Sequence, residues 1–252
     1  VTQMAHSHSR KKIKTRANLP SLEVPAALED GRIPLDRYEE DLLVRIPHFA
    51  EMKESDILNL YDGVTSLIMT YTLKKGEAED PDFNAELFIP KGRFPPAGGF
   101  TELSLDYEII DPVTEDGERS GKTVTVVFDR ESPGGTSLTA LSFTEEQKEG
   151  ITEEDLVDGY LPVTAYAWYG MEKGDFITPW LSELPASADS QELYLIKNAE
   201  IEISTAGTRT SLGFPKGSFT AAADYYFGYQ VRDKLGNTSV ISSTVKIAVN
   251  VG

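Results

Sequence analysis

The chain carries the same pattern twice. Residues 44–57 align without a gap on residues 163–176 at a constant offset of 119 residues, so that Met52 and Asp56 recur as Met171 and Asp175. Two further pairs of segments recur in the same order: 89–94 with 214–219 at an offset of 125, and 123–129 with 244–250 at an offset of 121. Three anchors in one order indicate a duplicated domain.

The length of 252 residues fits two units of about 110 residues, each large enough to bury its own core. The sequence has no cysteine, which excludes disulfides, thiolate metal sites and a cysteine nucleophile. No apolar run approaches the ~20 residues of a membrane helix, so we expect no membrane insertion.

Charge divides the chain unevenly. Residues 1–20 hold five basic residues and no acid, and the remainder carries 19 basic and 41 acidic residues, a net charge of −22. Such a body repels nucleic acid and anionic lipid, because phosphate binding needs a basic footprint. The basic segment lacks the apolar stretch of a signal peptide, and we interpret residues 1–20 as a disordered leader that includes His6 and His8.

Short β-rich runs separated by turn residues fill both units. The expected strands of unit one lie at 41–46, 55–61, 64–73, 84–89, 101–111 and 122–128, and those of unit two at 161–167, 175–180, 192–196, 200–204, 225–232 and 240–249. This spacing predicts an all-β chain of two β-sandwich domains, 21–134 and 135–252, joined by a hinge-like segment at 131–137. An acidic approach, 26–41 and 144–158, is expected before the first strand of each unit.

A turn near the end of unit two carries a family resemblance. The run Tyr225-Tyr-Phe227-Gly-Tyr229-Gln-Val231-Arg-Asp233-Lys-Leu-Gly236-Asn237-Thr-Ser239 resembles the penultimate strand, tight turn and final strand of bacterial immunoglobulin-like repeats. Asp233 can cap such a turn, and Gly236 and Asn237 accept positive φ. Unit one differs, with a longer loop at 113–120.

The resemblance implies a pair of immunoglobulin-like sandwiches in a bacterial surface or secreted protein, outside the cell, beside neighbouring repeats of the same kind. Its implied role is that of a non-enzymatic structural or adhesive module, with a protein or a glycan of another cell surface as partner.

The repeated anchor can be interpreted in two ways. Phe49 or Trp168, with Tyr61 or Trp180, could form an aromatic platform for sugar rings. Alternatively, the anchor is a bend between the first two strands whose Met and aromatic residue close the end of the core. If a ligand binds, the candidate residues are Trp168, Tyr169 and Trp180 of unit two, and the tryptophan that binds it must be exposed to solvent.

Catalytic patterns are weak. His48 is the one histidine outside the leader, and no Gly-x-Ser-x-Gly motif occurs, so no enzyme activity is predicted. The segment 117–123 resembles the end of a phosphate-binding loop but has three residues between its glycines where that loop has four, which favours a hairpin turn. Acids are abundant enough that no carboxylate pair for glycoside hydrolysis can be chosen by spacing.

Calcium is the cofactor that so many acids could serve, although no D-x-D-x-D-G loop occurs. Asp129, Glu131 and the acids at 153–155 could bind Ca²⁺ and stiffen the junction between the domains; otherwise these acids are solvated charge and the protein has no cofactor. Two alternatives to the adhesive role stay open: a carbohydrate-binding module, and a structural component of a phage tail or secretion particle.

Overall fold

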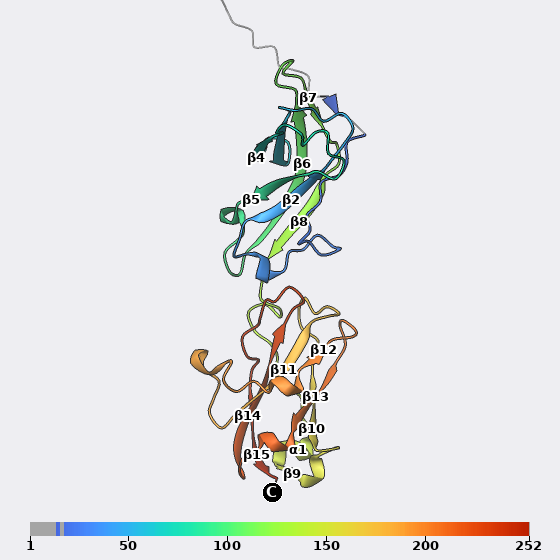
Figure 1. Ribbon diagram of the computed structural model, residues 1–252. Coiled ribbons are helices and arrows are strands. Elements are labelled where there is room, and N and C mark those ends of the chain that lie inside the picture. Colours follow the sequence, from blue (N-terminus) through green and yellow to red (C-terminus); the bar gives the residue numbers. More distant parts are fainter. Residues whose placement is uncertain (1–13, 16–17, 252) are drawn as a thin grey trace, which may run out of the picture. The chain divides into compact units, whose positions relative to one another are not determined.

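The computed structural model describes residues 14–15 and 18–251 and divides the chain into two compact units, Val1–Asp129 and Arg130–Gly252 (Figure 1). Among the described residues, no helix is both long and apolar enough to cross a membrane.

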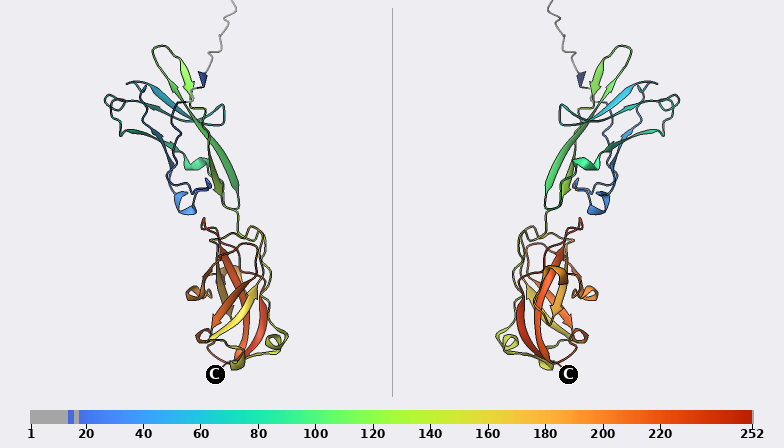
Figure 2. Two further views of the ribbon diagram at one scale, coloured as in Figure 1. Left: turned by 90° about the vertical axis from the view of Figure 1, so that its right-hand side faces the viewer. Right: turned by 90° about the vertical axis from the view of Figure 1, so that its left-hand side faces the viewer.

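Unit one is built from two sheets. The larger one joins β4 (Ser66–Thr72), β3 (Ile57–Asp62) and β6 (Phe100–Ile110), with β8 (Val124–Asp129) on the first half of β6, β7 (Gly117–Arg119) on its second half, and β1 (Lys14–Thr15) parallel to β7. The smaller sheet pairs β2 (Leu42–Pro47) with β5 (Asn84–Ile89). Figure 2 shows the β6–β7 hairpin, in green, at one end of the unit.

Unit two repeats this plan. Its larger sheet has the order β12 (Ile201–Glu202), β11 (Phe176–Ser182), β14 (Ala223–Arg232), β15 (Val245–Asn250) and β9 (Ile151–Thr152). Its smaller sheet pairs β10 (Tyr160–Ala165) with β13 (Thr210–Pro215).

In each unit, one segment pairs first with the smaller sheet and then with the larger one. It contains Glu23 and Arg32 in unit one, and Ser142 and β9 in unit two, and it is called the first strand below. Its beginning bridges to the smaller sheet, through Glu23 and Arg45 in unit one and through Ser142 and Thr164 in unit two. Its continuation runs parallel to the last strand, at Arg32 beside Val127 and in the pairing of β9 with β15. Both units are therefore immunoglobulin-like β-sandwiches, and the fold class expected from the sequence is confirmed.

Alternating side chains fill the two cores. β5 exposes and buries residues in strict alternation, as expected for a strand with one face on the core. In unit two the ring of Phe227 meets Phe143, Phe214 and Phe219 with ring centroids 5.1–6.2 Å apart. Each buried aromatic side chain stabilises the fold by about 1.5–3 kcal/mol.

Unit two has a tyrosine that ties the start of β14 to the preceding corner. The hydroxyl of Tyr225 donates to the carbonyl of Ala221 (3.1 Å) and accepts the backbone N–H groups of Thr220 (3.0 Å) and Ala221 (3.2 Å). Such a corner is a hallmark of immunoglobulin-like domains. In unit one a different tyrosine, Tyr107, reaches the first strand, since its hydroxyl donates to Pro20 O (2.9 Å).

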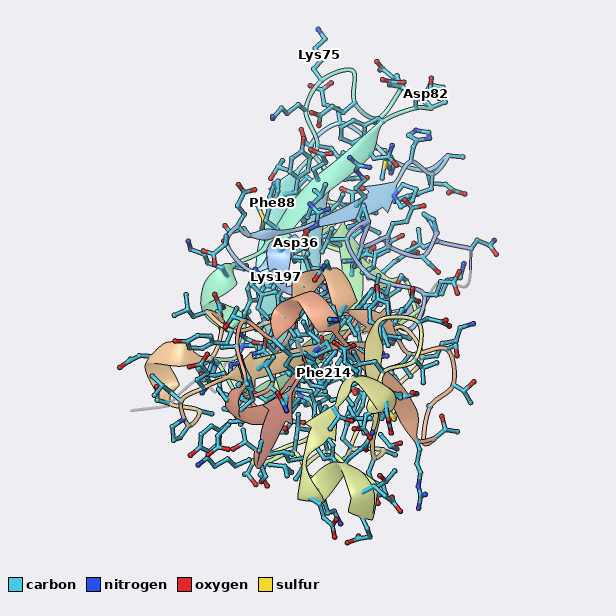
Figure 3. The ribbon with its side chains drawn as sticks, turned by 90° about the horizontal axis from the view of Figure 1, so that it is seen from below. Asp36, Lys75, Asp82, Phe88, Lys197 and Phe214 are labelled. Atoms are coloured by element: carbon cyan, nitrogen blue, oxygen red, sulfur yellow. The ribbon has the colours of Figure 1, made fainter. Side chains whose placement is uncertain are left out.

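The helices are single turns that connect strands: η1 (Leu35–Arg37), η2 (Lys91–Arg93), α1 (Glu145–Glu149), η3 (Glu153–Asp155), η4 (Ala188–Ser190), η5 (Lys197–Ala199) and η6 (Lys216–Ser218). α1 begins with a capping box, in which the Thr144 hydroxyl accepts the Gln147 N–H and the Gln147 side chain accepts the Thr144 N–H. Figure 3 shows Lys75 and Asp82 projecting from the loop between β4 and β5.

The acidic approaches do not precede the first strands. Buried residues on either side of Glu23 and Ser142 already belong to the sandwiches, and the acidic segments 26–41 and 144–158 contain the second half of each first strand, at Arg32 and at β9. Because those first halves pair through single bridges, they lack the long alternation that marks a strand in sequence.

The leader expected over residues 1–20 is wrong where the structure describes it. Residues 14–15 form β1, and Leu19 is 1% exposed in the core of unit one. Residues 1–13 and 16–17, which include His6 and His8, lie outside the described residues.

Two expected elements, at 192–196 and at 117–123, differ in the structure, and one strand of unit two was not expected. Residues 192–196 form no strand and make one bridge, Leu195 to Trp180. The sequence does not predict β13, because its two apolar residues Leu212 and Phe214 are separated by Gly213 and preceded by the polar Thr210 and Ser211. Residues 117–119 are the strand β7, and the hairpin turn precedes them.

Candidate functional site

The repeated anchor closes one end of each sandwich. It forms the bend between β2 and β3, and again between β10 and β11, where Met52 and Met171 are buried. The carboxylate of Asp56 accepts the backbone N–H of Lys53 (3.0 Å), and that of Asp175 accepts the N–H of Glu172 (2.8 Å). The bend interpretation therefore describes the anchor in both copies.

Burial sets the protonation behaviour of these carboxylates. Desolvation raises the pKa of Asp56 and of Asp175 above the ordinary value of 3.8, and the backbone N–H that each accepts opposes the rise. A second carboxylate adds to it in each unit, Asp111 beside Asp56 and Asp233 beside Asp175. In both copies, therefore, a second acid from another turn acts on the carboxylate of the bend.

The second acid of each pair organises a turn. Asp233 Oδ1 accepts the N–H groups of Leu235 (2.9 Å) and Asn237 (2.8 Å), as expected of a turn cap. Gly236 has φ +101°, whereas Asn237 is buried without positive φ and donates its side-chain amide to Asp233 Oδ2 (2.9 Å). The positive φ expected for Asn237 is therefore wrong, because its side chain completes the cap instead.

Asp111 caps the longer turn of unit one in the same way. Its Oδ1 accepts the N–H groups of Val113 (2.8 Å) and Thr114 (3.3 Å). These backbone donors lower the pKa of Asp111, whereas burial raises the pKa of Asp233. The same residue type therefore has opposite shifts in the two copies, according to whether its turn is solvated.

Trp180 lies on the outward face of the larger sheet of unit two, opposite Gly228 on β14. Residues 183–200 cover it, with the ring of Tyr194 edge-on at 5.9 Å and Leu195 bridged to its backbone. Its exposure is 0%, so Trp180 offers no ring face to a ligand, and the exposure that the platform required of this residue is absent. In Figure 1 the η4 turn of this covering segment stands out at the left of unit two.

Trp168 and Tyr169 lie at the bend before β11. Trp168 is half-buried and packs against the core of unit two, while Tyr169 is 85% exposed and its carbonyl accepts the N–H of Gly134 (3.0 Å). The structure does not join these residues to Trp180 in one surface, and a ligand-binding role for Trp168 and Tyr169 stays a prediction.

Of the acids proposed for calcium, Asp129 ends unit one, and Glu131 and the acids at 153–155 are separated within unit two. Ser243, before β15, donates its N–H to Leu138, whereas β9 pairs with the last residues of β15, so the η3 turn that follows β9 lies at the other end of the sandwich from Glu131. Asp155 accepts the Thr152 N–H (2.8 Å), and Glu153 pairs with Lys216. Residues 14–15 and 18–251 contain no group of three or more His, Cys, Asp or Glu that could hold a metal ion.

His48 contacts the backbone of a neighbouring loop. Its Nε2 lies 2.9 Å from the carbonyl oxygen of Ala78, to which it donates when that nitrogen carries the proton. The contact fastens the end of β2 to the loop before β5.

The smaller sheet of unit two has an outward face that we did not single out in the sequence. Tyr160, Pro162 and Thr164 alternate with buried residues along β10, and Tyr166 follows its last residue; Tyr160 and Tyr166 are 48% and 38% exposed. The sequence signal for these residues is the alternation with period two, because the residues between the buried ones must point to solvent.

Comparisons with known proteins give a fold-level likeness. No family model matches the chain, and no curated protein matches it. Solved structures similar to it include the FN1–FN3 domains of chicken CNTN1, at 11% identity and a TM-score of 0.42, covering 95% of this chain and 68% of that chain. A Ca²⁺-stabilised, ice-binding adhesin of an Antarctic bacterium is 14% identical with a TM-score of 0.43, over 95% of this chain and 51% of that chain.

A 1.5-MDa bacterial ice-binding adhesin shows the same level of likeness, at 11% identity and a TM-score of 0.40, over 95% of this chain and 66% of that chain. At such identities and TM-scores, the fold of this chain rests on its own strand order, and its function is argued below from its own residues.

Proposed function

We propose that the chain is a non-enzymatic structural and adhesive module built from two immunoglobulin-like units. The observation that carries this proposal is what the repeated residues do. Met52, Asp56 and their counterparts Met171 and Asp175 close the sandwich ends and build bends. Residues kept in both copies thus serve the fold, as in repeat arrays whose units differ mainly on their surfaces.

In this proposal the protein works at a cell surface or outside the cell, where it stands beside further immunoglobulin-like repeats of a bacterial surface or secreted protein. Its partner is a protein or glycan of another surface. Cysteine-free sandwiches suit this role, because their stability comes from apolar packing and sheet hydrogen bonds rather than from disulfides.

The test is a blot of fractionated native cells with an antibody raised against this chain. The proposal predicts a band on the surface or in the medium that is accessible to protease added to intact cells. A band confined to the cytosol would contradict it, and copurification with particles would favour the particle component instead.

A carbohydrate-binding module is the second candidate, favoured by the 85% exposure of Tyr169 beside the half-buried Trp168. Both tryptophans of the chain lie in unit two, so quenching of their fluorescence by soluble glycans reports binding to that unit. Quenching that Tyr169→Ala leaves unchanged would remove Tyr169 from the site.

A further inference from the structure

The two smaller sheets have the same strand register, but the outward-facing residues at their centres are charged in unit one and uncharged in unit two. In unit one the centre of the face is a charged row, because Glu23 lies beside Arg45 and Arg45 lies opposite Glu86. Arg45 Nη2 lies 3.2 Å from Glu86 Oε1. In unit two the same three positions hold Ser142, Thr164 and Ser211.

Two neighbouring positions of the unit-two face are uncharged as well. Pro162 stands where unit one has Leu43, and Gly213 stands where unit one has Phe88, which Figure 3 labels on β5. The ring of Tyr160 lies against Gly213 so closely that a Cβ there would come within 3.1 Å of it. A flat, hydroxyl-bearing strip therefore replaces the charged row and its phenylalanine.

A tyrosine stands at each end of this strip. Tyr160 takes the position of Asp41, and Tyr166 takes that of Pro47. The Tyr166 hydroxyl donates to Ser142 Oγ (3.3 Å), and the Arg209 guanidinium lies over the Tyr166 ring at 5.0 Å. The two half-exposed rings are six residues apart, at the first residue of β10 and at the residue that follows its last, which places them about 20 Å from each other.

The size of the strip limits what can occupy it. Three strands about 4.8 Å apart and a length of about 20 Å give an area near 200 Å². A stable protein interface buries about 800 Å² on each partner, several times more. A second copy or a globular partner would need much more surface, whereas an extended narrow chain fits.

We propose that this strip, defined by Tyr160, Pro162, Thr164, Tyr166 and Ser211, binds a neutral polysaccharide that lies along β10. Aromatic faces at both ends stack on sugar rings, and the hydroxyls between them exchange hydrogen bonds with sugar hydroxyls. The absence of acids from the strip, in a chain of net charge −17, suits an uncharged ligand. The proposal rests on the adhesive function and names the ligand class of unit two.

The test is native affinity electrophoresis of the full chain through gels that contain galactomannan, xyloglucan or hydroxyethylcellulose, with alginate as an acidic polysaccharide. At least one neutral polysaccharide should retard the native chain. Tyr160→Ala or Tyr166→Ala should raise the polysaccharide concentration for half-retardation roughly tenfold. A chain that no neutral polysaccharide retards, or that alginate alone retards, would overturn the proposal.

Matched double variants exchange the faces at constant net charge. Thr164→Arg with Ser211→Glu places the unit-one pair on the strip and should abolish the retardation, while Arg45→Thr with Glu86→Ser in unit one should leave it unchanged. Equal loss in both variants would overturn the assignment to unit two. Tryptophan fluorescence confirms that unit two is folded in each variant.

Two outcomes would refute polysaccharide binding without refuting the proposed adhesive function. A chain that fractionates to the cell surface and is never retarded refutes the polysaccharide strip and leaves the adhesive role standing. Sedimentation of the native chain as a dimer that Thr164→Arg with Ser211→Glu converts to a monomer would also refute it, because a second copy would then occupy the strip.

Discussion

The two units share their bends and strand registers and differ in what they present outward. On the larger sheet of unit one, Tyr61 donates to Glu108 Oε2 (3.0 Å) beneath the guanidinium of Arg119, 4.5 Å from its ring. At the corresponding place in unit two, Trp180 is buried under residues 183–200. Tyr61 thus belongs to a polar cluster in unit one, whereas its counterpart Trp180 is a buried aromatic residue in unit two.

The smaller sheets differ in the opposite sense, since unit one presents the Arg45–Glu86 ion pair and unit two presents tyrosines and hydroxyls. The difference shows that the duplicated interior permits each surface to diverge independently. Residues that are the same in both copies build the sandwich, so functional residues are expected at positions where the two copies differ.

The largest expected effect is at the covered aromatic residue. Trp180→Ala should lower the unfolding free energy of unit two by about 3–5 kcal/mol, since it leaves a large cavity between sheet and loop. Urea denaturation followed by the fluorescence of the remaining Trp168 measures it. Tyr61→Phe is the matched change in unit one and should leave that fluorescence transition where it is. A loss below about 1 kcal/mol for Trp180→Ala would mean that residues 183–200 do not pack on the ring.

Tyr225→Phe tests the corner that unit two has and unit one lacks. The change removes the acceptor of two backbone N–H groups, those of Thr220 and Ala221, and should cost unit two about 2 kcal/mol. The same fluorescence transition reports it. An unchanged midpoint would show that water replaces the hydroxyl at no cost.

The repeated bend gives a smaller effect with a pH signature. Asp175→Ala removes the acceptor of the Glu172 N–H and should cost about 1 kcal/mol, whereas Asp175→Asn keeps an acceptor and should cost less. Because the folded pKa of Asp175 is raised, the folded unit binds more protons than the unfolded chain between pH 3.8 and that raised value. Unfolding free energy should therefore fall as pH rises through this window.

Asp175→Asn should flatten that pH dependence in the denaturation midpoint of unit two, leaving the part due to Asp233, whose pKa is also raised. Asp56→Asn is the control in unit one and should not alter the fluorescence transition. A steeper dependence after Asp175→Asn would contradict the assignment of the shift to burial.

The smallest effect is expected at the charged row. Arg45→Thr with Glu86→Ser removes a solvent-exposed ion pair and should change the stability of unit one by about 0.5 kcal/mol. Far-ultraviolet circular dichroism during thermal unfolding measures it. A loss of several kcal/mol would mean that the row stabilises the sheet, and unit one would no longer serve as a neutral control.

Strands with clear alternation could be predicted from the sequence. β5 was predicted with its observed bounds, and β2 and β6 within one residue of theirs, because their exposed and buried residues alternate or their apolar runs are long. The first strands could not be predicted, since each divides between two sheets and pairs with each of them over one or two residues. Gly213 interrupts the apolar pattern of β13, and the ring of Tyr160 packs against it in the folded sheet.

The candidate site was predicted only in part. The repeat located the bend with Trp168, and the burial of Trp180 depends on residues 183–200, whose covering position no local pattern reveals. The outward strip of β10 depends on which face of the strand meets the core and on the register with β13, which are properties of the folded sheet.

Amide chemical shifts of the ¹⁵N-labelled full chain, titrated with an oligosaccharide cut from a polysaccharide that retards it, test the central claim most directly. One spectrum reports both copies at once. The account predicts shifts along β10 and β13, centred on Thr164 and Ser211, and none at Arg45 and Glu86 of unit one. Shifts at the unit-one positions, or none on β10, would contradict it.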